Sequence, residues 1–398
     1  MWIVSVRARS LITQAAELLS AHDGDALRAN AELRRLHPDL DGDRIAALID
    51  QASLAVLASA RHGIDPTGLL LTRDGLEQAT RPAVSAQRAA LLVQQGARHV
   101  LDLTAGLGFD TRAFLAAGLQ VVAVERNPAT AAMLRVNAPG AEVIEGDALA
   151  VAPALIADLA PHDVVFIDPA RRSGRRTADG ARAHPERDPE RWSPPWSFVT
   201  SLSEGGARVC AKVAPGFAPA SLPPGWCGVW TSVDRTMVEA MTCSWDIGAQ
   251  RTARSIADVT VDFASSDLLP GPTSPVSAWL IEPDASLVSA HLLDAWCSTH
   301  AGVHRIDPTG PWLTSATEVT DPLVRAFAVI DQLPNDAKGL RRALIAHGIG
   351  DLTVKCRGMG IDAEALRRQL RLPPGRPGTL VIARAQGRRT SLLVHDHR

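Results

Sequence analysis

Several residue types are scarce in this chain, and each scarcity narrows what the protein can be. Tyrosine is absent, and aromatic residues make up 4% of the 398 residues. Lysine occurs only three times, so the other 38 of the 41 basic residues are arginine. We attribute this bias to genome composition, so arginine abundance is weak evidence for RNA binding. The formal net charge of −2 excludes a global electrostatic attraction to nucleic acid.

Cysteine pairs and long apolar runs are also missing. The five cysteines are odd in number and far apart, and no Cys-x-x-Cys pair indicates a zinc site or a disulfide framework. They are typical of small buried hydrophobic residues in a reducing cytosol. No run of 18 apolar residues predicts a membrane span, and the first residues do not have the pattern of a signal peptide. We therefore expect a cytoplasmic protein with neither a metal nor a membrane partner.

Short apolar runs in the first half of the chain predict the parallel β-strands of an α/β fold. Parallel strands are buried on both faces and read as continuous apolar segments. Four such runs are Val100–Leu103, Val121–Val124, Glu142–Glu145 and Val164–Ile167. Ligands bind beyond the carboxyl ends of such strands, near the point where the strand order reverses. The residues that follow each run are therefore the candidate site.

The residues of the turn after the first run help to decide which kind of nucleotide ligand binds. Gly106 and Gly108 remove side chains where the backbone must approach a ligand closely. The dinucleotide fingerprint G-x-G-x-x-G requires a third glycine, but Thr111 stands in its place. Asp110 adds negative charge where a pyrophosphate would lie, which disfavours NAD. A ligand with a cationic sulfonium and an amino-acid tail fits better, because Asp102 and Asp110 can face positive charge.

The other strand ends supply the rest of a site for an adenosine-containing cofactor. Thr104 opens the glycine turn. Glu125, followed by Arg126, ends the second run, where a carboxylate can accept hydrogen bonds from both ribose hydroxyls. Asp147, followed by Ala148, comes after the third run, where its side chain can contact the adenine edge. The glycine turn alone is a weak signal, but the four strand ends in this order indicate a cofactor site.

These motifs resemble those of class I S-adenosylmethionine-dependent methyltransferases. The matching segments are Asp102–Gly108, Glu125–Pro128, Gly146–Ala148 and Asp168–Arg171. Just upstream, Leu76–Thr80 and Ala86–Ala89 resemble a bacterial subgroup that carries a C-terminal THUMP-like domain. The resemblance implies a Rossmann-like sheet, S-adenosyl-L-methionine as cofactor, and a cytoplasmic enzyme that modifies structured RNA (tRNA or rRNA).

The fourth run ends in Asp168-Pro169-Ala170-Arg171, which we predict to be the catalytic loop. Pro169 has no N–H and fixes φ, so it shapes the exit from the strand. In amine-modifying relatives such a loop accepts hydrogen bonds from the target amino group, a role that falls here to Asp168. Those relatives continue with a second proline and an aromatic residue, whereas Ala170 and Arg171 follow here. This departure argues against plain adenine-N6 chemistry. Arg171 can stack on a base, hold a phosphate or form a surface salt bridge.

The segment after the catalytic loop is basic and carries two tryptophans. From Arg171 to Trp192 the chain has seven arginines, Arg172 among them, and four acidic residues, which predicts a flexible loop over the site. Trp192 and Trp196 flank a Pro-Pro pair. Aromatic residues beside a basic loop suit stacking on an unpaired base. A hydrophobic anchor that holds the loop down is the equal alternative.

Periodicity and composition divide the chain into five parts. Residues 1–80 show the apolar spacing of amphipathic helices and predict a helical N-terminal domain. Residues 81–263 hold the methyltransferase motifs, and residues 264–275 are rich in Ser, Pro, Gly and Asp, which is typical of a linker. Residues 276–320 resemble a small ferredoxin-like unit, and residues 321–398 resemble the THUMP-like domain, a small α+β module.

The sequence therefore predicts an RNA methyltransferase, with two alternatives left open. One is a small-molecule methyltransferase whose C-terminal domain covers a compact pocket. The other is a non-catalytic, cofactor-binding protein associated with RNA. An open, arginine-lined groove would favour RNA, and a pocket closed by apolar residues would favour a small molecule.

Overall fold

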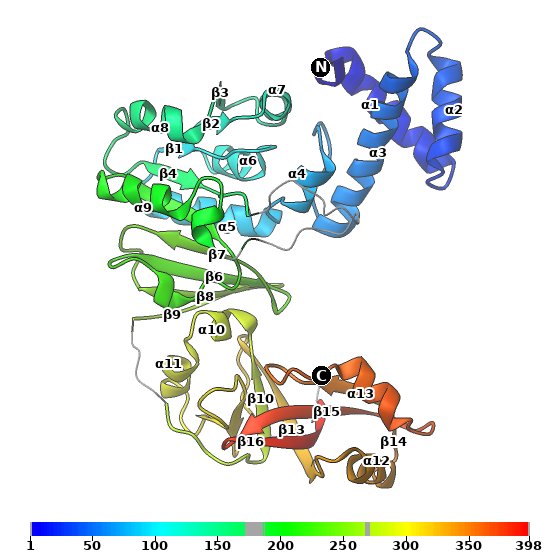
Figure 1. The fold of residues 1–398 in the computed structure, drawn as a ribbon, viewed down its shortest axis with the longest axis vertical. Helices are drawn as coiled ribbons and strands as arrows, with labels where there is room; N and C mark the ends of the chain where they lie inside the picture. The colour runs from blue at the N-terminus through cyan, green and yellow to red at the C-terminus, as the bar shows by residue number, and fades with distance from the viewer. Residues whose placement is uncertain (1, 172–185, 187, 267–270, 397–398) are drawn as a thin grey trace. The chain divides into compact units, whose positions relative to one another are not determined.

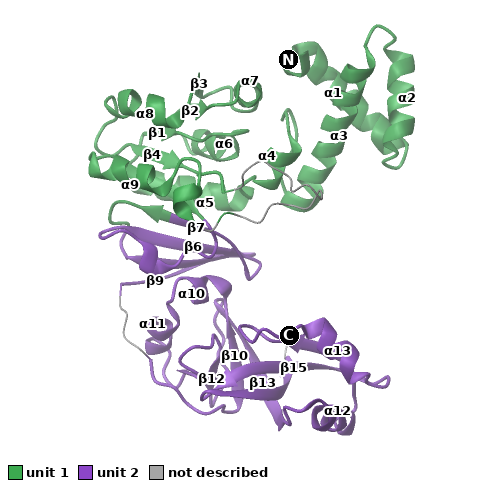
Figure 2. Cartoon of the chain, in the orientation of Figure 1, with its two compact units in different colours: residues 1–213, 242–247 green, residues 214–241, 248–398 purple. Residues whose placement is uncertain are grey.

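The computed structural model of the chain describes residues 2–171, 186, 188–266 and 271–396 (Figure 1). Arg172 lies outside the described residues. The chain forms two compact units, shown in Figure 2. Unit 1 comprises residues 1–213 and 242–247, and unit 2 comprises residues 214–241 and 248–398. The five-part division of the sequence stays a prediction, and each unit is described separately below.

Three amphipathic helices begin unit 1, after a 3₁₀ turn at Trp2–Val4. They are α1 (Val6–Ala21), α2 (Ala26–Leu36) and α3 (Gly42–His62). The helix-like periodicity is confirmed, because Leu11, Leu33 and Ile45 meet in one buried apolar cluster. Each helix begins at a side-chain cap, as the Asp41 carboxylate shows by accepting a hydrogen bond from the Arg44 N–H.

Two shorter helices, α4 (Arg73–Glu77) and α5 (Pro82–Gln94), lead into the sheet. The irregular segment before α4 is held by two buried amide side chains. Gln51 of α3 exchanges two hydrogen bonds with the backbone of Leu71. Asn137 exchanges two with the backbone of Leu70 and donates a third to the Leu107 carbonyl. These bonds tie the N-terminal helices to the glycine turn.

The core of unit 1 is a parallel sheet in the order β3-β2-β1-β4-β5. Its strands are β1 (His99–Asp102), β2 (Gln120–Glu125), β3 (Glu142–Glu145), β4 (Val164–Ile167) and β5 (Arg208–Val213). The helices that connect them are α6 (Phe109–Ala116), α7 (Pro128–Asn137), α8 (Ala148–Ile156) and α9 (Trp196–Glu204). A 3₁₀ turn at Pro189–Arg191 precedes α9. The predicted Rossmann-like fold is confirmed.

The strand order reverses between β1 and β4. Leu101 of β1 pairs with Val122 of β2 on one side and with Val165 of β4 on the other. The chain goes from β1 outward to β3 and then returns to the other side of β1, which opens a crevice at the carboxyl ends of β1 and β4. All four predicted strand ends therefore meet along one edge of the sheet.

The first part of unit 2 holds strands that the sequence analysis did not predict. They are β6 (Cys227–Val233), β8 (Arg251–Ile256) and β9 (Thr260–Ser265), and a 3₁₀ turn at Pro219–Ser221 precedes them. β6 pairs with β8 in parallel, and β8 pairs with β9 in antiparallel. β7 (Thr236–Cys243) starts in unit 2 and ends in unit 1. Because β9 ends at Ser265, it extends into the predicted linker.

The rest of unit 2 is a seven-stranded sheet in the order β11-β12-β10-β13-β16-β15-β14. The strands are β10 (Trp279–Pro283), β11 (His304–Arg305), β12 (Leu313–Ser315), β13 (Val324–Leu333), β14 (Ile349–Lys355), β15 (Arg376–Ala385) and β16 (Arg388–Asp396). The helices are α10 (Ala285–Ser289), α11 (Leu293–Ser298), α12 (Ala337–Ala346) and α13 (Ala363–Leu370). The ferredoxin-like and THUMP-like segments thus share one sheet, since β10 pairs with β13.

Gly108→Ala should destabilise unit 1 more than Gly106→Ala. Both glycines have positive φ, 86° and 56°, so alanine at either position costs roughly 1–2 kcal/mol of backbone strain. At Gly108 the new Cβ would also lie 2.5 Å from Cδ1 of the buried Leu134, whereas at Gly106 it would meet nothing within 4 Å. Urea unfolding without cofactor measures the difference. Equal losses in the two variants would show that Leu134 moves aside without cost.

Candidate active site

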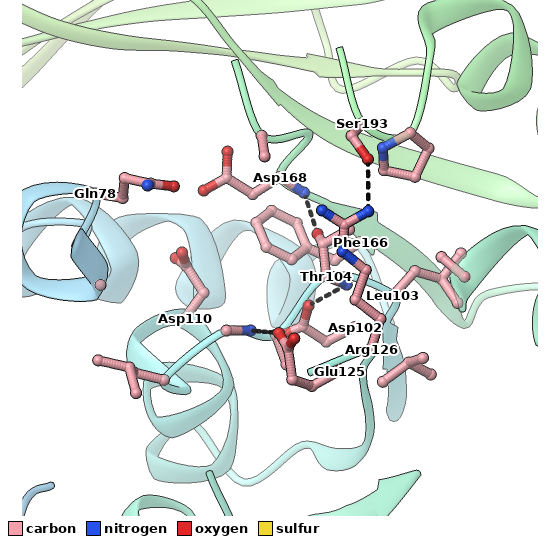
Figure 3. Close-up of a pocket in the computed structure, with 18 of the residues that line it drawn as sticks. Gln78, Asp102, Leu103, Thr104, Asp110, Glu125, Arg126, Phe166, Asp168 and Ser193 are labelled. Atoms are coloured by element: carbon pink, nitrogen blue, oxygen red, sulfur yellow. Dashed lines mark hydrogen bonds between the residues drawn. The ribbon is translucent and has the colours of Figure 1, made fainter. Parts of the chain in front are cut away.

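A cavity of about 240 Å³ lies in unit 1 at the carboxyl ends of the strands (Figure 3). Most of the predicted site residues line it: Asp102, Thr104, Gly106, Asp110, Glu125, Arg126, Asp147, Ala148 and Asp168. Gly108, Pro169 and Arg171 are not among its lining residues, although Ala170 is. One cavity therefore brings together all four predicted strand ends.

Glu125 is anchored by backbone N–H groups at the end of β2. Its Oε2 accepts a hydrogen bond from the Gly106 N–H at 3.1 Å, and its Oε1 accepts one from the Asn127 N–H at 2.7 Å. The first bond crosses from β2 to the glycine turn, so it fixes the turn and the carboxylate together. Each carboxylate oxygen has further acceptor capacity for a ligand. A rigid double acceptor of this kind suits a pair of vicinal hydroxyls.

Asp102 is a buried carboxyl at the end of β1. It accepts a hydrogen bond from the Thr111 hydroxyl at 2.6 Å and another from the Thr104 N–H at 3.3 Å. Burial, reinforced by the charges of Asp110 and Asp168, raises the pKa of Asp102 from 3.8 to about 7, despite these two bonds. The group therefore titrates near neutral pH, beside the cavity.

Asp110 is held by a buried cation and a hydroxyl. Its Oδ1 is in an ion pair with Nη1 of Arg88, which lies on α5. Its Oδ2 accepts a hydrogen bond from the Thr80 hydroxyl at 2.7 Å. The Arg88 guanidinium also lies over the ring of Phe166, 5.0 Å from its centroid. Much of the Asp110 charge is thus balanced within the protein, which differs from the expectation that it faces a cationic ligand.

Asp168 is fixed at its backbone and at its side chain. Its N–H donates to the Thr104 hydroxyl at 2.7 Å, and its Oδ2 is 2.7 Å from Nζ of Lys212 on β5. The Asp168 side chain is 25% exposed and the Lys212 side chain 8% exposed. In Figure 3 the Asp168 carboxylate and the Gln78 carboxamide point toward one another. The carboxylate therefore reaches the cavity while its cation stays buried.

The rest of the catalytic loop is closed by backbone bonds. Ala170 and Ser193 form an antiparallel bridge with N–H···O distances of 2.8 and 3.1 Å. Arg126 donates a hydrogen bond from Nη1 to the Ser193 hydroxyl at 3.1 Å. Its guanidinium therefore contacts the residue that forms this bridge. The half-buried Arg171 accepts a bond from the Glu186 N–H through its carbonyl. Pro169 is buried.

The remaining predicted residues have structural partners. Trp192 is 4% exposed, and its indole N–H donates to the Glu186 carbonyl at 3.1 Å. Its ring packs edge-on against Trp196, with centroids 6.2 Å apart. Of the two roles left open for this pair, the burial of Trp192 favours the hydrophobic anchor. Asp147 caps α8 by accepting a bond from the Leu149 N–H, and it lines the cavity beside Ala148.

Four residues near the cavity were missed as site residues: Gln78, Thr80, Arg88 and Lys212. Three of them lie within or next to the segments Leu76–Thr80 and Ala86–Ala89, which carried the resemblance to a subgroup, so their positions were already marked. Lys212 had a signal of its own, because it is a charged residue within an apolar run and one of three lysines in an arginine-rich chain.

The described residues contain neither a metal-binding cluster nor a membrane-spanning helix. No group of three or more His, Cys, Asp or Glu side chains that could hold a metal occurs among them. Within the same residues, no helix is long and apolar enough to cross a membrane.

Comparisons with known proteins agree with this geometry. A THUMP domain-like family model matches residues 324–396. An uncharacterized S-adenosylmethionine-dependent methyltransferase of Mycobacterium tuberculosis is 29% identical over 360 residues, covering 86% of this chain and 94% of that protein. A candidate methyltransferase from Porphyromonas gingivalis W83, solved by crystallography, superposes with a TM-score of 0.71 over 97% of this chain and 99% of that chain, at 19% identity.

The protein is an S-adenosylmethionine-dependent methyltransferase. A shorter match is to the ribosomal RNA large subunit methyltransferase E of Sorangium cellulosum, 39% identical over 101 residues, or 24% of this chain and 45% of that protein. The family and the THUMP-like C-terminal segment that the motifs predicted are both confirmed.

The cavity of the methyltransferase fits the cofactor that this family uses. At Gly106 a side chain would point into open space at the cavity wall, so the glycine leaves room for a ligand against the backbone. Glu125 offers a preorganised acceptor for the ribose, and the Asp102 carboxyl can balance a cationic group.

The affinity for S-adenosylmethionine should rise by about tenfold between pH 6 and pH 8. A cationic ligand favours the ionised form of Asp102, whose pKa of about 7 in the free protein means that binding must release a proton below that pH. The isosteric Asp102→Asn variant carries no titrating group and should bind with an affinity that does not vary over this range. Calorimetry at three pH values measures both proteins, and a pH-dependent Asn variant would assign the proton to another group.

The same group has a predictable effect on stability. Because the pKa of Asp102 is higher in the folded than in the unfolded protein, the folded state binds the proton more tightly. Its contribution to the free energy of unfolding therefore falls as pH rises from about 4 to about 7. In the Asp102→Asn variant the free energy of unfolding should therefore depend less on pH between about 4 and 7. Urea denaturation at each pH measures it.

Proposed function

We propose that this methyltransferase modifies a base nitrogen of structured RNA, tRNA or rRNA, with Asp168-Pro169-Ala170-Arg171 as the loop that receives the target. One observation carries the proposal: a single cavity holds both the anchored Glu125 carboxylate and the Asp168 carboxylate. The first suits the ribose of the cofactor, and the second suits a hydrogen-bond donor on the acceptor. Cofactor and target would then share one space.

The residues would hold the cofactor through the glycine turn and the strand ends. Glu125 would accept hydrogen bonds from the two ribose hydroxyls. Gly106 would let the backbone approach, and Asp147 with Ala148 would contact the adenine edge from the start of α8. Asp102 would face the positive charge. When bound, S-adenosylmethionine supplies a methyl group activated by its sulfonium.

Asp168 would orient the acceptor. A carboxylate oxygen that accepts a hydrogen bond from an amino N–H directs the nitrogen lone pair toward the methyl carbon. The methyl group would then pass to that nitrogen as its bond to sulfur breaks, with the electron pair of that bond left on sulfur, and the nitrogen would release its proton to solvent. Proximity and orientation of this kind can supply roughly 7–11 kcal/mol of the barrier reduction. No stronger base is required.

Three observations support RNA as the substrate class. The C-terminal segment matches a THUMP domain-like model, and one relative is named as a ribosomal RNA methyltransferase. The chain also carries a strongly basic segment directly after the catalytic loop. One observation favours the small-molecule alternative. Arg126 is the one arginine among the described residues that line the cavity, so the lining is not an arginine-rich groove.

Methyl transfer from labelled S-adenosylmethionine tests the substrate class. The protein would be incubated with bulk RNA from a strain that lacks the gene, with RNA from the parent strain, and with a small-molecule extract. We expect label in RNA from the deletion strain only, because the parent RNA is already modified. Nucleoside mass spectrometry then identifies the base. Label confined to the extract would establish the small-molecule alternative, and no label in any sample would favour the non-catalytic one.

Glu125→Gln should weaken the binding of S-adenosylmethionine by roughly 10- to 100-fold. The amide loses the charge and cannot accept from both the Gly106 and Asn127 N–H groups, and hydrogen bonds to charged groups contribute about 1.5–3 kcal/mol each. Glu145→Gln is the matched control, because Glu145 pairs with Glu125 in register at the end of β3 but is not among the residues lining the cavity. Similar calorimetric affinities for the two variants would remove Glu125 from the ribose site.

Asp168→Asn should lower kcat about 100-fold or more while the affinity for S-adenosylmethionine changes little. The amide can donate as well as accept, so it no longer fixes the direction of the acceptor N–H, and loss of alignment costs about this much. Single-turnover kinetics with the RNA identified above, together with calorimetry, separates the two effects. A variant with normal turnover would place the alignment of the acceptor elsewhere.

A further inference from the structure

Lys212 occupies an unusual position for a charged residue. It lies within β5, between Ala211 and Val213, both of which are buried. Its ammonium group is 2.7 Å from Asp168 Oδ2 and 2.9 Å from the Thr80 hydroxyl oxygen. An isolated ammonium in such a place would cost several kcal/mol of free energy, so its partners must balance it. The sheet therefore carries a cation directly beneath the catalytic loop.

The contacts of Lys212 extend beyond Asp168. Thr80 accepts from the ammonium and donates its own proton to Asp110 Oδ2 at 2.7 Å. Asp110 is in turn paired with Arg88 of α5. A hydroxyl has one proton to donate, so the direction of the Thr80 bonds is fixed by the two charges on either side. The ammonium is thereby held from two sides, by the catalytic loop and by the segment between α4 and α5.

We propose that Lys212 is a positioning residue for methyl transfer, which sets the orientation of the Asp168 carboxylate; this rests on the proposed role of Asp168. The ammonium occupies Oδ2, and the Thr104 hydroxyl holds the Asp168 N–H at 2.7 Å. With both ends of the residue fixed, Oδ1 is the carboxylate oxygen that is not paired with the ammonium, and we assign it to the acceptor. A carboxylate accepts hydrogen bonds and does not donate them, so the acceptor must present a donor to it.

The choice of lysine over arginine supports this role. Arginine supplies 38 of the 41 basic residues, yet a lysine stands at this buried position. An ammonium is a compact point charge with three donors, whereas a guanidinium is a planar fork that tends to bind both oxygens of a carboxylate. A guanidinium in this place would occupy the oxygen that the acceptor needs.

The first experiment compares Lys212→Met, Lys212→Arg and Lys355→Met in the full-length protein. Lys355→Met is the matched control, because Lys355 is also a strand lysine, 2.8 Å from the buried Glu282 carboxylate, and it belongs to unit 2. Lys212→Met should lower kcat at least 30-fold, with less than a threefold change in the affinity for S-adenosylmethionine. The acidic limb of its pH–activity profile should also move to higher pH, because the carboxylate has lost its counter-charge.

The two other variants separate position from charge and from stability. Lys212→Arg keeps the charge, so its pH profile should stay like that of the parent protein, while kcat remains reduced because both oxygens are engaged. Lys355→Met should lose stability but keep the parent kcat and pH profile. If Lys212→Met also behaves in that way, Lys212 has a structural role only and the proposal is overturned.

The second experiment does not depend on RNA methylation. Because the chain holds only three lysines, labelling lysine with nitrogen-15 gives a spectrum with at most three ammonium signals. The signal that Lys212→Arg removes belongs to Lys212. A paired and buried ammonium exchanges its protons slowly, so this signal should be visible in the parent protein and should shift or broaden in Asp168→Asn.

Outcomes of the two experiments are distinguishable. A Lys212 signal that does not respond to Asp168→Asn would overturn the pairing, whatever the substrate proves to be. A responsive signal combined with no RNA methylation by the parent protein would leave the pairing in place and refute the proposed RNA substrate alone. Lys212→Met with the parent kcat and pH profile would overturn the positioning role directly.

Discussion

The balance of buried charge beneath the strand ends is the constraint on which this site depends. Three carboxyl groups, Asp102, Asp110 and Asp168, lie close enough that the charges of the other two raise the pKa of the first. Two buried cations, Arg88 and Lys212, pair with the second and the third. Because an unpaired buried charge costs several kcal/mol, removing any one partner disturbs the others. The cofactor turn and the catalytic loop are therefore connected by electrostatics as well as by backbone.

This constraint explains why the segment before the first strand belongs to the site. Thr80 and Arg88 lie outside the Rossmann-like sheet, yet both contact Asp110 of α6. Gln51 and Asn137 hold the adjoining backbone through five hydrogen bonds to Leu70, Leu71 and Leu107. Without this segment, Asp110 would lose the Arg88 guanidinium and the Thr80 hydroxyl that balance its charge. The N-terminal part is thus tied to the core by polar contacts rather than by apolar packing alone.

The predicted catalytic loop departs from the pattern of amine-modifying relatives at Ala170, and this residue is held in a backbone bridge. Ala170 forms a backbone bridge with Ser193, and a small side chain suits a strand-like pair of this kind. Trp192, the residue before Ser193, is buried. What an aromatic side chain supplies in those relatives would here have to come from the lining residues, among them Gln78, which faces Asp168.

The sequence by itself determined the sheet and the strand ends that line the cavity, because buried parallel strands read as apolar runs and their ends carry Asp102, Glu125 and Asp168. The helix periods of the N-terminal part were equally readable. Only the tertiary structure decided which charges pair. Lys212 lies 44 residues from Asp168 along the chain and 132 from Thr80, and pairing at such separations depends on how strands align, which local periodicity does not encode.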